Sequence, residues 1–230
     1  QARAIPASRR MPTIEPPTAR KRGSRRGFAW GMVGAMPPVL LKQKLTAPAP
    51  WAEAIARPRL LAQLDELVDS GHHVGLFAGT GHGKTALLSA WAQTRPVAWL
   101  TLDAEDADLD VALAYLIAAF EAALPDFQTE AHGLLGRARE RQGAFATLSA
   151  LLADLDEQLA RPLVLVIDDY QLAASPSLDA LVARMLKYLP AQVRLVLAAR
   201  KPPAIEAASL QARGALAVVD EPALAFDAAE

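Results

Sequence analysis

The residues best suited to chemistry lie between Val74 and Ala92, where a short apolar run, a glycine-rich turn and a second apolar segment follow one another. The turn is Ala78-Gly79-Thr80-Gly81-His82-Gly83-Lys84-Thr85. It matches the phosphate-loop pattern, a glycine and any four residues followed by Gly-Lys-Ser or Gly-Lys-Thr, except at the first position, where alanine stands. The stretch therefore predicts a strand, a phosphate-binding loop and a helix in direct succession.

Each residue type in this turn has a physical reason to be there. Glycine lets the backbone curl so that its N–H groups, together with the positive end of the following helix, converge on phosphate oxygens. Lys84 adds a mobile positive charge for the outer phosphates, and the Thr85 hydroxyl can take one position on a magnesium ion. The alternative is an ordinary glycine-rich turn, which the Lys-Thr pair argues against. We expect nucleotide phosphates to contact Gly79, Thr80, Gly81, His82, Gly83, Lys84, Thr85 and Ala86.

A second candidate feature is the apolar run 163–167, which ends in Asp168 and Asp169. Such a run predicts a buried parallel strand whose carboxyl end faces the ligand crevice. Phosphoryl chemistry needs one carboxylate for magnesium, a role that suits Asp168, and a second that orients or deprotonates the attacking water, a role that suits Asp169. The run alone is a weak signal. It becomes a strong one when a phosphate loop precedes it.

A third apolar run, 193–199, ends in Arg200. Because parallel strands end at the same edge of a sheet, we expect Arg200 to lie near Asp168. A guanidinium at that place can contact the terminal phosphate and stabilise transition-state charge. The alternative is a salt bridge between Arg200 and Asp168 or Asp169.

The segment before the loop contains Arg57 and Arg59, followed by leucines 60, 61, 64 and 67 on one helical face. The two arginines either flank the adenine or ribose or lie exposed at a helix-capping turn. Farther along, Asp103 to Asp108 follows a second apolar strand and precedes a helix. Carboxylates favour a helix N-terminus in their own right, so we interpret this acidic segment as capping.

The amino-acid composition limits the class of protein to which this chain can belong. The 230 residues are 52% hydrophobic and 21% charged, which is ordinary for one globular domain. Cysteine is absent, so disulfides and thiolate metal sites are excluded, and the four histidines show no metal-ligand spacing. No apolar run approaches the ~18 residues of a membrane helix. A twin-arginine-like stretch at Arg25-Arg26 is followed by an apolar segment that Pro37-Pro38 interrupts, so we expect the cytoplasm rather than export.

The net charge of −1 is unevenly distributed. Residues 1–37 carry eight Arg and Lys against one acidic residue, which leaves 16 basic and 24 acidic residues for the remainder. We expect 1–37 to be a disordered basic tail or upstream sequence, with nonspecific nucleic-acid binding as the less favoured alternative. Residues 38–71 then form a leading segment and helix, and 72–230 form the core.

Five apolar strands that alternate with helices predict an α/β fold, a doubly wound, mainly parallel sheet of the P-loop NTPase kind with helices on both faces. Beyond the fold, a series of short motifs across residues 40–230 resembles, in the same order, the STAND-class ATPases of the large LuxR-type transcriptional regulators, the group typified by the maltose-regulon activator. The motifs are Leu41-Lys42-Gln43-Lys44-Leu45, Arg57-Pro58-Arg59-Leu60, Ala78 to Thr85 (Walker A), Trp99 to Asp103, Asp168-Asp169-Tyr170 (Walker B), Ala199 to Pro203 and Leu210 to Gly214.

The resemblance implies a strand order of 5-1-4-3-2 and a phosphate loop in which alanine at the first position is usual. Departures are His82 where tyrosine is usual and Ala199 where serine is usual. It also implies ATP with Mg²⁺ as cofactors, self-association in the ATP-bound form and slow hydrolysis that resets a switch. DNA would be contacted only through domains that these residues do not include, and no membrane is implied.

Two further functions stay open at this point. One is a remodelling or motor-like P-loop ATPase that acts on a protein or nucleic acid. The other is a noncatalytic nucleotide-binding scaffold.

Overall fold

The computed structural model describes residues 40–50, 55–136, 141–204 and 215–226. The chain divides into two compact units, Gln1–Met32 and Val33–Glu230, and all described residues belong to the second. The tail predicted for 1–37 lies outside the described residues. So does most of a helix expected near 204–212.

The core is one parallel sheet of five strands in the order β2-β3-β4-β1-β5. The predicted order 5-1-4-3-2 is the same order counted from the opposite edge, so this prediction is confirmed. The strands are β1 His73–Phe77, β2 Val97–Thr101, β3 Leu163–Asp168, β4 Val193–Ala199 and β5 Leu216–Asp220. β1 and β3 therefore flank β4, and all three end at the same edge of the sheet.

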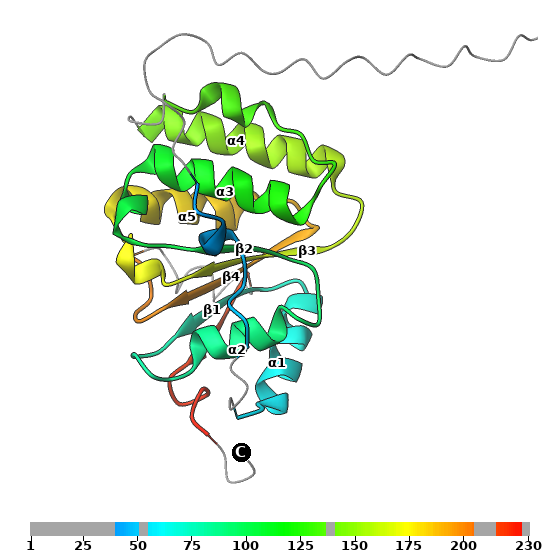
Figure 1. Ribbon diagram of the computed structural model, residues 1–230, viewed down its shortest axis with the longest axis vertical. Helices are drawn as coiled ribbons and strands as arrows, with labels where there is room; N and C mark the ends of the chain where they lie inside the picture. The colour runs from blue at the N-terminus through cyan, green and yellow to red at the C-terminus, as the bar shows by residue number, and fades with distance from the viewer. Residues whose placement is uncertain (1–39, 51–54, 137–140, 205–214, 227–230) are drawn as a thin grey trace, which may run out of the picture. The chain divides into compact units, whose positions relative to one another are not determined.

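Helices cover both faces of the sheet (Figure 1). Helices α1 and α2 pack on one face; α3 and α5 pack on the other, and α4 contacts both of them. Their bounds are α1 Pro58–Asp69, α2 Lys84–Trp91, α3 Leu109–Ala123, α4 Arg141–Gln158 and α5 Pro176–Tyr188. Short 3-10 turns are η1 Lys42–Leu45, η2 Ala104–Ala107, η3 Glu130–Leu134 and η4 Tyr170–Leu172.

Successive side chains along a strand point to opposite faces of the sheet, and together they form two hydrophobic cores. In β3, for example, Val164 and Val166 join the core under α1 and α2, whereas Leu163, Leu165 and Ile167 join the core under α3, α4 and α5. Both sets are almost fully buried, which is why the strand is a continuous apolar run in the sequence.

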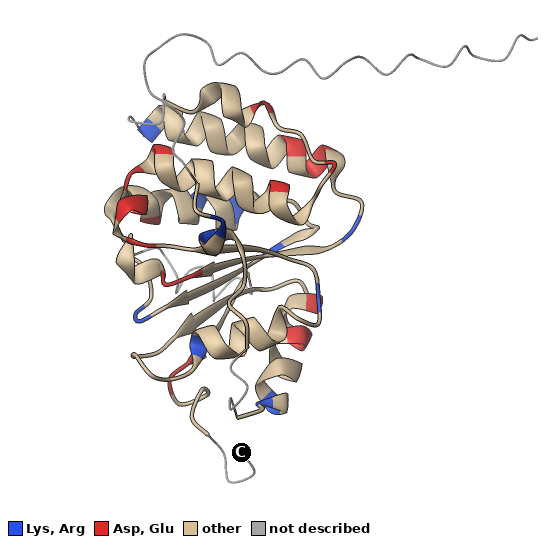
Figure 2. Cartoon of the chain, viewed as in Figure 1, with Lys and Arg blue, Asp and Glu red and all other residues tan. Residues whose placement is uncertain are grey.

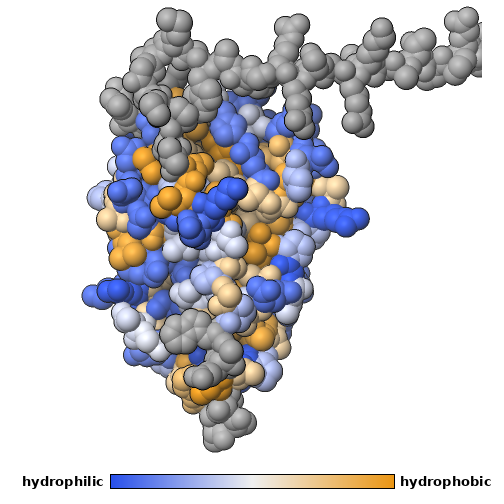
Figure 3. Space-filling view, viewed as in Figure 1, coloured by the Kyte–Doolittle hydropathy of each residue, from blue (hydrophilic) through white to orange (hydrophobic). Residues whose placement is uncertain are grey.

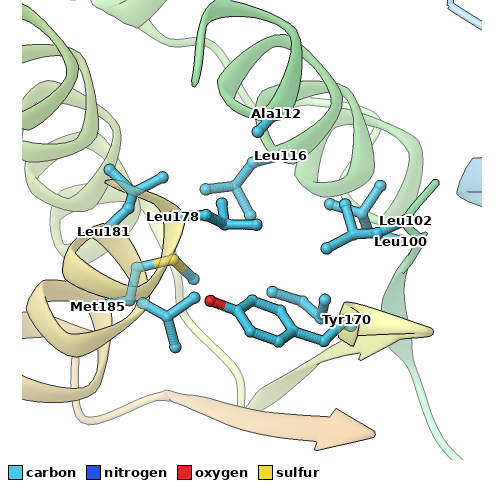
Figure 4. Close-up of a pocket in the computed structure, with 10 residues that line it drawn as sticks. Leu100, Leu102, Ala112, Leu116, Tyr170, Leu178, Leu181 and Met185 are labelled. Atoms are coloured by element: carbon cyan, nitrogen blue, oxygen red, sulfur yellow. The ribbon is translucent and has the colours of Figure 1, made fainter. Parts of the chain in front are cut away.

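A small gap remains in the second core, between β2, β3, α3 and α5 (Figure 4). Its volume is about 20 Å³ and its lining is almost entirely apolar, with Leu100, Leu116 and Met185 among the lining residues. That volume is about the size of one water molecule, and water needs polar partners to stay in such a space. It is therefore a packing gap and does not bind a ligand.

The leading segment is held to the sheet by a buried ion pair. Lys44, 8% exposed, lies 2.5 Å from Asp106 and 3.0 Å from Asp103, and its ammonium group lies 4.2 Å from the centre of the Tyr115 ring. Burial acts against the ammonium group, but the two carboxylates raise its pKa above the ordinary value. The acidic segment thus binds a lysine as well as capping helices.

The capping interpretation itself is confirmed. Asp103 accepts a hydrogen bond from the Glu105 N–H, and Asp106 accepts one from the Asp103 N–H, which forms a capping box at η2. Asp108 is the N-cap of α3 and accepts hydrogen bonds from the N–H groups of Asp110 and Val111.

The surface carries scattered apolar groups. On the face in Figure 3, hydrophobic and hydrophilic side chains are interspersed. Among the helices in the described ranges, none is both long enough and apolar enough to cross a membrane.

One titratable group is built into the sheet. His73 at the start of β1 is buried, and its Nδ1 accepts a hydrogen bond of 3.0 Å from the Leu195 N–H of the neighbouring strand. Burial, with smaller contributions from the charges of Arg194 and His72, lowers the pKa of His73 to about 4. The ring is therefore neutral in the folded protein near pH 7.

Acidification is expected to destabilise the fold through this ring. Because the pKa of His73 is lower in the folded chain than in the unfolded one, its stabilising contribution is complete above about pH 6.5 and falls as the pH drops towards 4. The expected loss of unfolding free energy is roughly 3 kcal/mol. Urea unfolding at several pH values measures it.

His73→Asn is the matched control, since its amide oxygen can still accept the Leu195 N–H but does not titrate. Stability of this variant should fall less between pH 6.5 and 4 than that of the wild type. Parallel pH dependences in the two proteins would assign the acid sensitivity to other groups.

Candidate functional site

The glycine-rich turn lies between β1 and α2, as the sequence predicts. Gly81 has φ +87° and Gly83 has φ +72°, a left-handed conformation that residues with a Cβ rarely adopt. Gly83 is also the N-cap of α2, so the loop backbone leads directly into the positive end of that helix. This is the local geometry that collects backbone N–H groups around an anion.

Lys84 folds back over the loop. Its ammonium group donates hydrogen bonds to the carbonyl oxygens of Ala78 (2.7 Å) and Gly79 (2.9 Å). Burial lowers its pKa; the charges of Asp168, Asp169 and Glu221 oppose that shift, and the charge of Arg200 adds to it. The ends of β3, β4 and β5 thus all place a charged group close enough to act on this lysine, and both signs of charge are seen at this edge of the sheet in Figure 2.

Asp168 ends β3 and is 1% exposed. Burial raises the pKa of its carboxyl group above the ordinary value, and the Thr85 side chain and the Asp169 N–H act in the opposite direction. Its oxygen Oδ2 is buried and has no hydrogen-bond partner of ordinary geometry. A buried carboxylate oxygen without a partner, next to a threonine hydroxyl, fits the oxygen ligands that Mg²⁺ prefers.

Magnesium usually keeps several of its waters, so few protein ligands are needed. Within the described ranges no cluster of three or more acidic or histidine side chains is arranged to hold a metal ion. The pair Thr85 and Asp168 is the arrangement that a partly hydrated ion bound to nucleotide phosphates would use.

Asp169 has an unusual backbone. Its φ of 54° and ψ of 32° are left-handed, and it is the one non-glycine residue with positive φ in the described part of the chain. Aspartate tolerates this conformation better than most residues, although it still carries strain, and such strain is common at functional sites. The Asp169 carboxylate accepts a hydrogen bond of 2.9 Å from the side-chain amide of Gln171.

Arg200 follows the last residue of β4 and is exposed. Its backbone N–H donates a hydrogen bond of 3.0 Å to the side-chain oxygen of Gln171. The alternative considered from the sequence, a salt bridge from Arg200 to Asp168 or Asp169, is not among the ion pairs of the described residues. Its guanidinium is thus left to face solvent at the site.

Glu221 was not predicted from the sequence. It follows β5, and its carboxylate accepts a hydrogen bond of 3.1 Å from the Gly79 N–H and lies 3.4 Å from His82 Nε2. The same argument that selected Asp168, an acidic residue at the carboxyl end of a parallel strand, also selects Glu221 once β5 is recognised. The loop of this structure therefore already binds an anionic group, a carboxylate of the chain itself.

Beside the loop lies an open pocket of about 590 Å³, lined by Gly81, His82, Glu221, Pro222, Leu224, Ala225 and Phe226. Pockets of this size, with apolar walls and a few polar groups, are typical of small-molecule sites. The wall formed by residues 221–226 could not be assigned from the sequence, because this segment is too short to show a helical or strand periodicity.

Arg57 and Arg59 hold this wall in place. Arg57 is 6% exposed, donates hydrogen bonds to the carbonyl oxygens of Leu224 (2.5 Å) and Ala225 (3.1 Å), and lies 4.4 Å from the centre of the Phe226 ring. Arg59 donates to the carbonyl oxygens of Ala223 and Ala225, both at 3.2 Å. The exposed-arginine alternative is therefore wrong for Arg57, although Arg59 is exposed.

Comparison with known proteins agrees with this geometry. The chain is 33% identical over 192 residues to the HTH-type transcriptional regulator MalT of Klebsiella pneumoniae, and 33% identical over 193 residues to MalT of Cronobacter sakazakii. Each match covers 82% of this chain and 21% of the regulator. Over these residues the chain is MalT-like, and its fold is that of a P-loop NTPase. It spans about a fifth of the length of these MalT relatives.

Solved structures with a similar arrangement include the Walker-type ATPase PABY2304 of Pyrococcus abyssi, with a TM-score of 0.47, 18% identity, and coverage of 66% of this chain and 47% of that one. A structure of Drosophila ORC bound to AT-rich DNA and Cdc6 gives a TM-score of 0.46 and 11% identity, with coverage of 71% and 53%. Neither TM-score reaches 0.5, so the family resemblance rests on the sequence similarity to MalT. No protein-family model matches the chain.

Removing the charge of Glu221 should strengthen binding of a phosphate ligand by this MalT-like domain. The carboxylate occupies the Gly79 N–H and repels an incoming phosphate, and two unit charges about 4 Å apart in water interact by about 1 kcal/mol. Glu221→Gln is therefore expected to bind ADP roughly fivefold more tightly, as measured by calorimetry.

Glu157→Gln on the exposed side of α4 makes the same chemical change far from the loop and should leave the affinity unaltered. Weaker ADP binding by Glu221→Gln would show that Glu221 belongs to the ligand site and does not compete with the ligand.

Proposed function

We propose that this chain binds and slowly hydrolyses ATP as the switch module of a transcriptional regulator. The observation that carries the proposal is the convergence of Lys84, Asp168, Asp169 and Arg200 on one sheet edge around a loop shaped for anions. The similarity to MalT supports the regulatory part, because those relatives are transcriptional regulators.

Binding would exchange internal contacts for contacts with the nucleotide. Phosphate oxygens would replace the Glu221 carboxylate at the Gly79 N–H, and Lys84 would leave the carbonyl oxygens of Ala78 and Gly79 for the outer phosphates. The remaining loop residues from Thr80 to Ala86 would supply backbone N–H groups at the start of α2. The base would lie in the pocket beside Phe226, whose wall Arg57 and Arg59 hold.

Thr85 and Asp168 would hold Mg²⁺, which when bound supplies charge neutralisation for the phosphates. Asp169, whose carboxylate is half-buried at the same edge, would orient the attacking water and accept its proton. Arg200 would contact the terminal phosphate, stabilising charge in the transition state and making its own position depend on the nucleotide.

Slow turnover is what a switch needs, since the lifetime of the ATP state then sets the duration of the signal. By the resemblance to MalT, the ATP form would self-associate and act in the cytoplasm. DNA contact would fall to segments other than these residues. Fast turnover stimulated by DNA or protein would favour the remodelling ATPase instead, and tight ATP binding without phosphate release would favour the noncatalytic scaffold.

Lys84→Ala is expected to weaken ATP binding at least about a hundredfold, because a charge-assisted contact to phosphate is lost. Isothermal calorimetry measures the affinity, and thermal unfolding shows whether the fold is intact. Lys42→Ala on η1 removes an exposed lysine and is the matched control. Unchanged affinity in Lys84→Ala would contradict the phosphate-loop assignment.

Asp169→Asn should keep ATP binding but slow phosphate release by about a hundredfold or more, as loss of a general base does. Asparagine is the better test than alanine because it tolerates the left-handed backbone that this position requires. Single-turnover release of phosphate measures the effect. Normal release by a folded Asp169→Asn protein would move the role of the base to another group.

A further inference from the structure

Gln171 contacts both Asp169 and Arg200, the two residues to which the proposed hydrolysis gives catalytic roles. It lies on η4, two residues after Asp169, and its side chain reaches the end of β4. Its amide nitrogen Nε2 donates a hydrogen bond of 2.9 Å to Asp169 Oδ1, and its amide oxygen Oε1 accepts one of 3.0 Å from the Arg200 N–H. No motif in the sequence marked this residue.

The chemistry of the two partners fixes which way the amide points. A carboxylate only accepts hydrogen bonds, and a backbone N–H only donates them. A primary amide carries a donor and an acceptor side by side, so it satisfies both partners at once in one orientation. Glutamate has the same shape but two acceptors, and alanine reaches neither partner. The bridge is therefore specific to the amide.

We propose that Gln171 is a positioning residue that ties the Asp169 carboxylate to the backbone at Arg200. The inference rests on the proposed ATP hydrolysis. Because one amide contacts both groups, a shift of the Arg200 backbone that follows contact with the terminal phosphate would change where the Asp169 carboxylate lies. The amide thus makes the alignment of the water-activating group depend on the residue that contacts the phosphate.

A second bridge, which does not involve Gln171, also joins η4 to the segment after β4. The Tyr170 hydroxyl donates a hydrogen bond of 2.5 Å to Asp179 Oδ1, and the other oxygen of Asp179 accepts one of 3.2 Å from the Ala204 N–H. Tyr170 and Asp179 are buried, whereas Gln171 is half-buried. Removing the Gln171 amide therefore leaves η4 attached to the segment after β4 through the buried bridge.

The test compares Gln171→Glu and Gln171→Ala with the wild-type 230-residue chain, using ATP with Mg²⁺ and measuring phosphate release. Both variants should keep KM and calorimetric ATP affinity and lose kcat by about tenfold or more.

The other charges that act on this edge, Lys84, Asp168, Arg200 and Glu221, are the same in all of these proteins. Gln158→Glu is the matched control. Gln158 on α4 likewise donates to the Gln128 carbonyl (2.7 Å) and accepts from the Gln128 N–H (3.1 Å). It precedes the start of β3, whereas the site lies at the end of that strand. This control should keep the wild-type kcat.

Wild-type kcat in both Gln171 variants would overturn the inference while leaving ATP hydrolysis in place. An equal loss of kcat and ATP affinity would also overturn it, since that result indicates a disturbed fold. A wild-type chain that binds ATP but releases no phosphate would remove the proposed function, and the positioning role would fall with it.

Discussion

The parallel sheet imposes the constraint on which the site depends, since neighbouring strands β3, β4 and β1 must end at the same edge. These strands are buried over most of their length, and the charged groups of the site come from their carboxyl ends and the segments that directly follow. Asp168, Arg200 and the loop with Lys84 come from segments far apart in the sequence. The register of the ladder brings them within electrostatic reach of one another.

Charged and polar groups at this sheet edge need partners, and in the structure most of them are paired with groups of the chain itself. Lys84 is bound by two carbonyl oxygens of its own loop, and the Gly79 N–H is bound by the Glu221 carboxylate. Asp168 keeps one buried oxygen without a partner, and burial holds its pKa above the ordinary value. A ligand that carries phosphate oxygens and a divalent cation would satisfy all of these groups at once, which supports the proposed nucleotide.

The sequence predicted the strands and the principal charged groups because each rests on a local pattern, whereas the strand order was implied by the family resemblance. Apolar runs show buried strands directly, and the phosphate loop contains its own geometry in Gly81 and Gly83. It did not predict Glu221 or the pocket beside Phe226, because the segment after β5 is short and makes long-range hydrogen bonds to Arg57, Arg59 and Gly79. Lys44 was missed as a partner of Asp106 for the same reason, since 62 residues separate them.

The bridges after β3 differ in what they hold. Tyr170 and Asp179 are buried and join η4 to the segment after β4 through a short hydrogen bond, so they set where the backbone runs. Gln171 lies nearer the surface and holds a carboxylate whose backbone is already strained at φ 54°. Strain of this kind persists only when surrounding contacts maintain it, and an amide that can exchange with water is a weaker restraint than a buried phenol. The fold thus has a buried bridge that joins η4 to the segment after β4 and a half-buried one that contacts the Asp169 carboxylate.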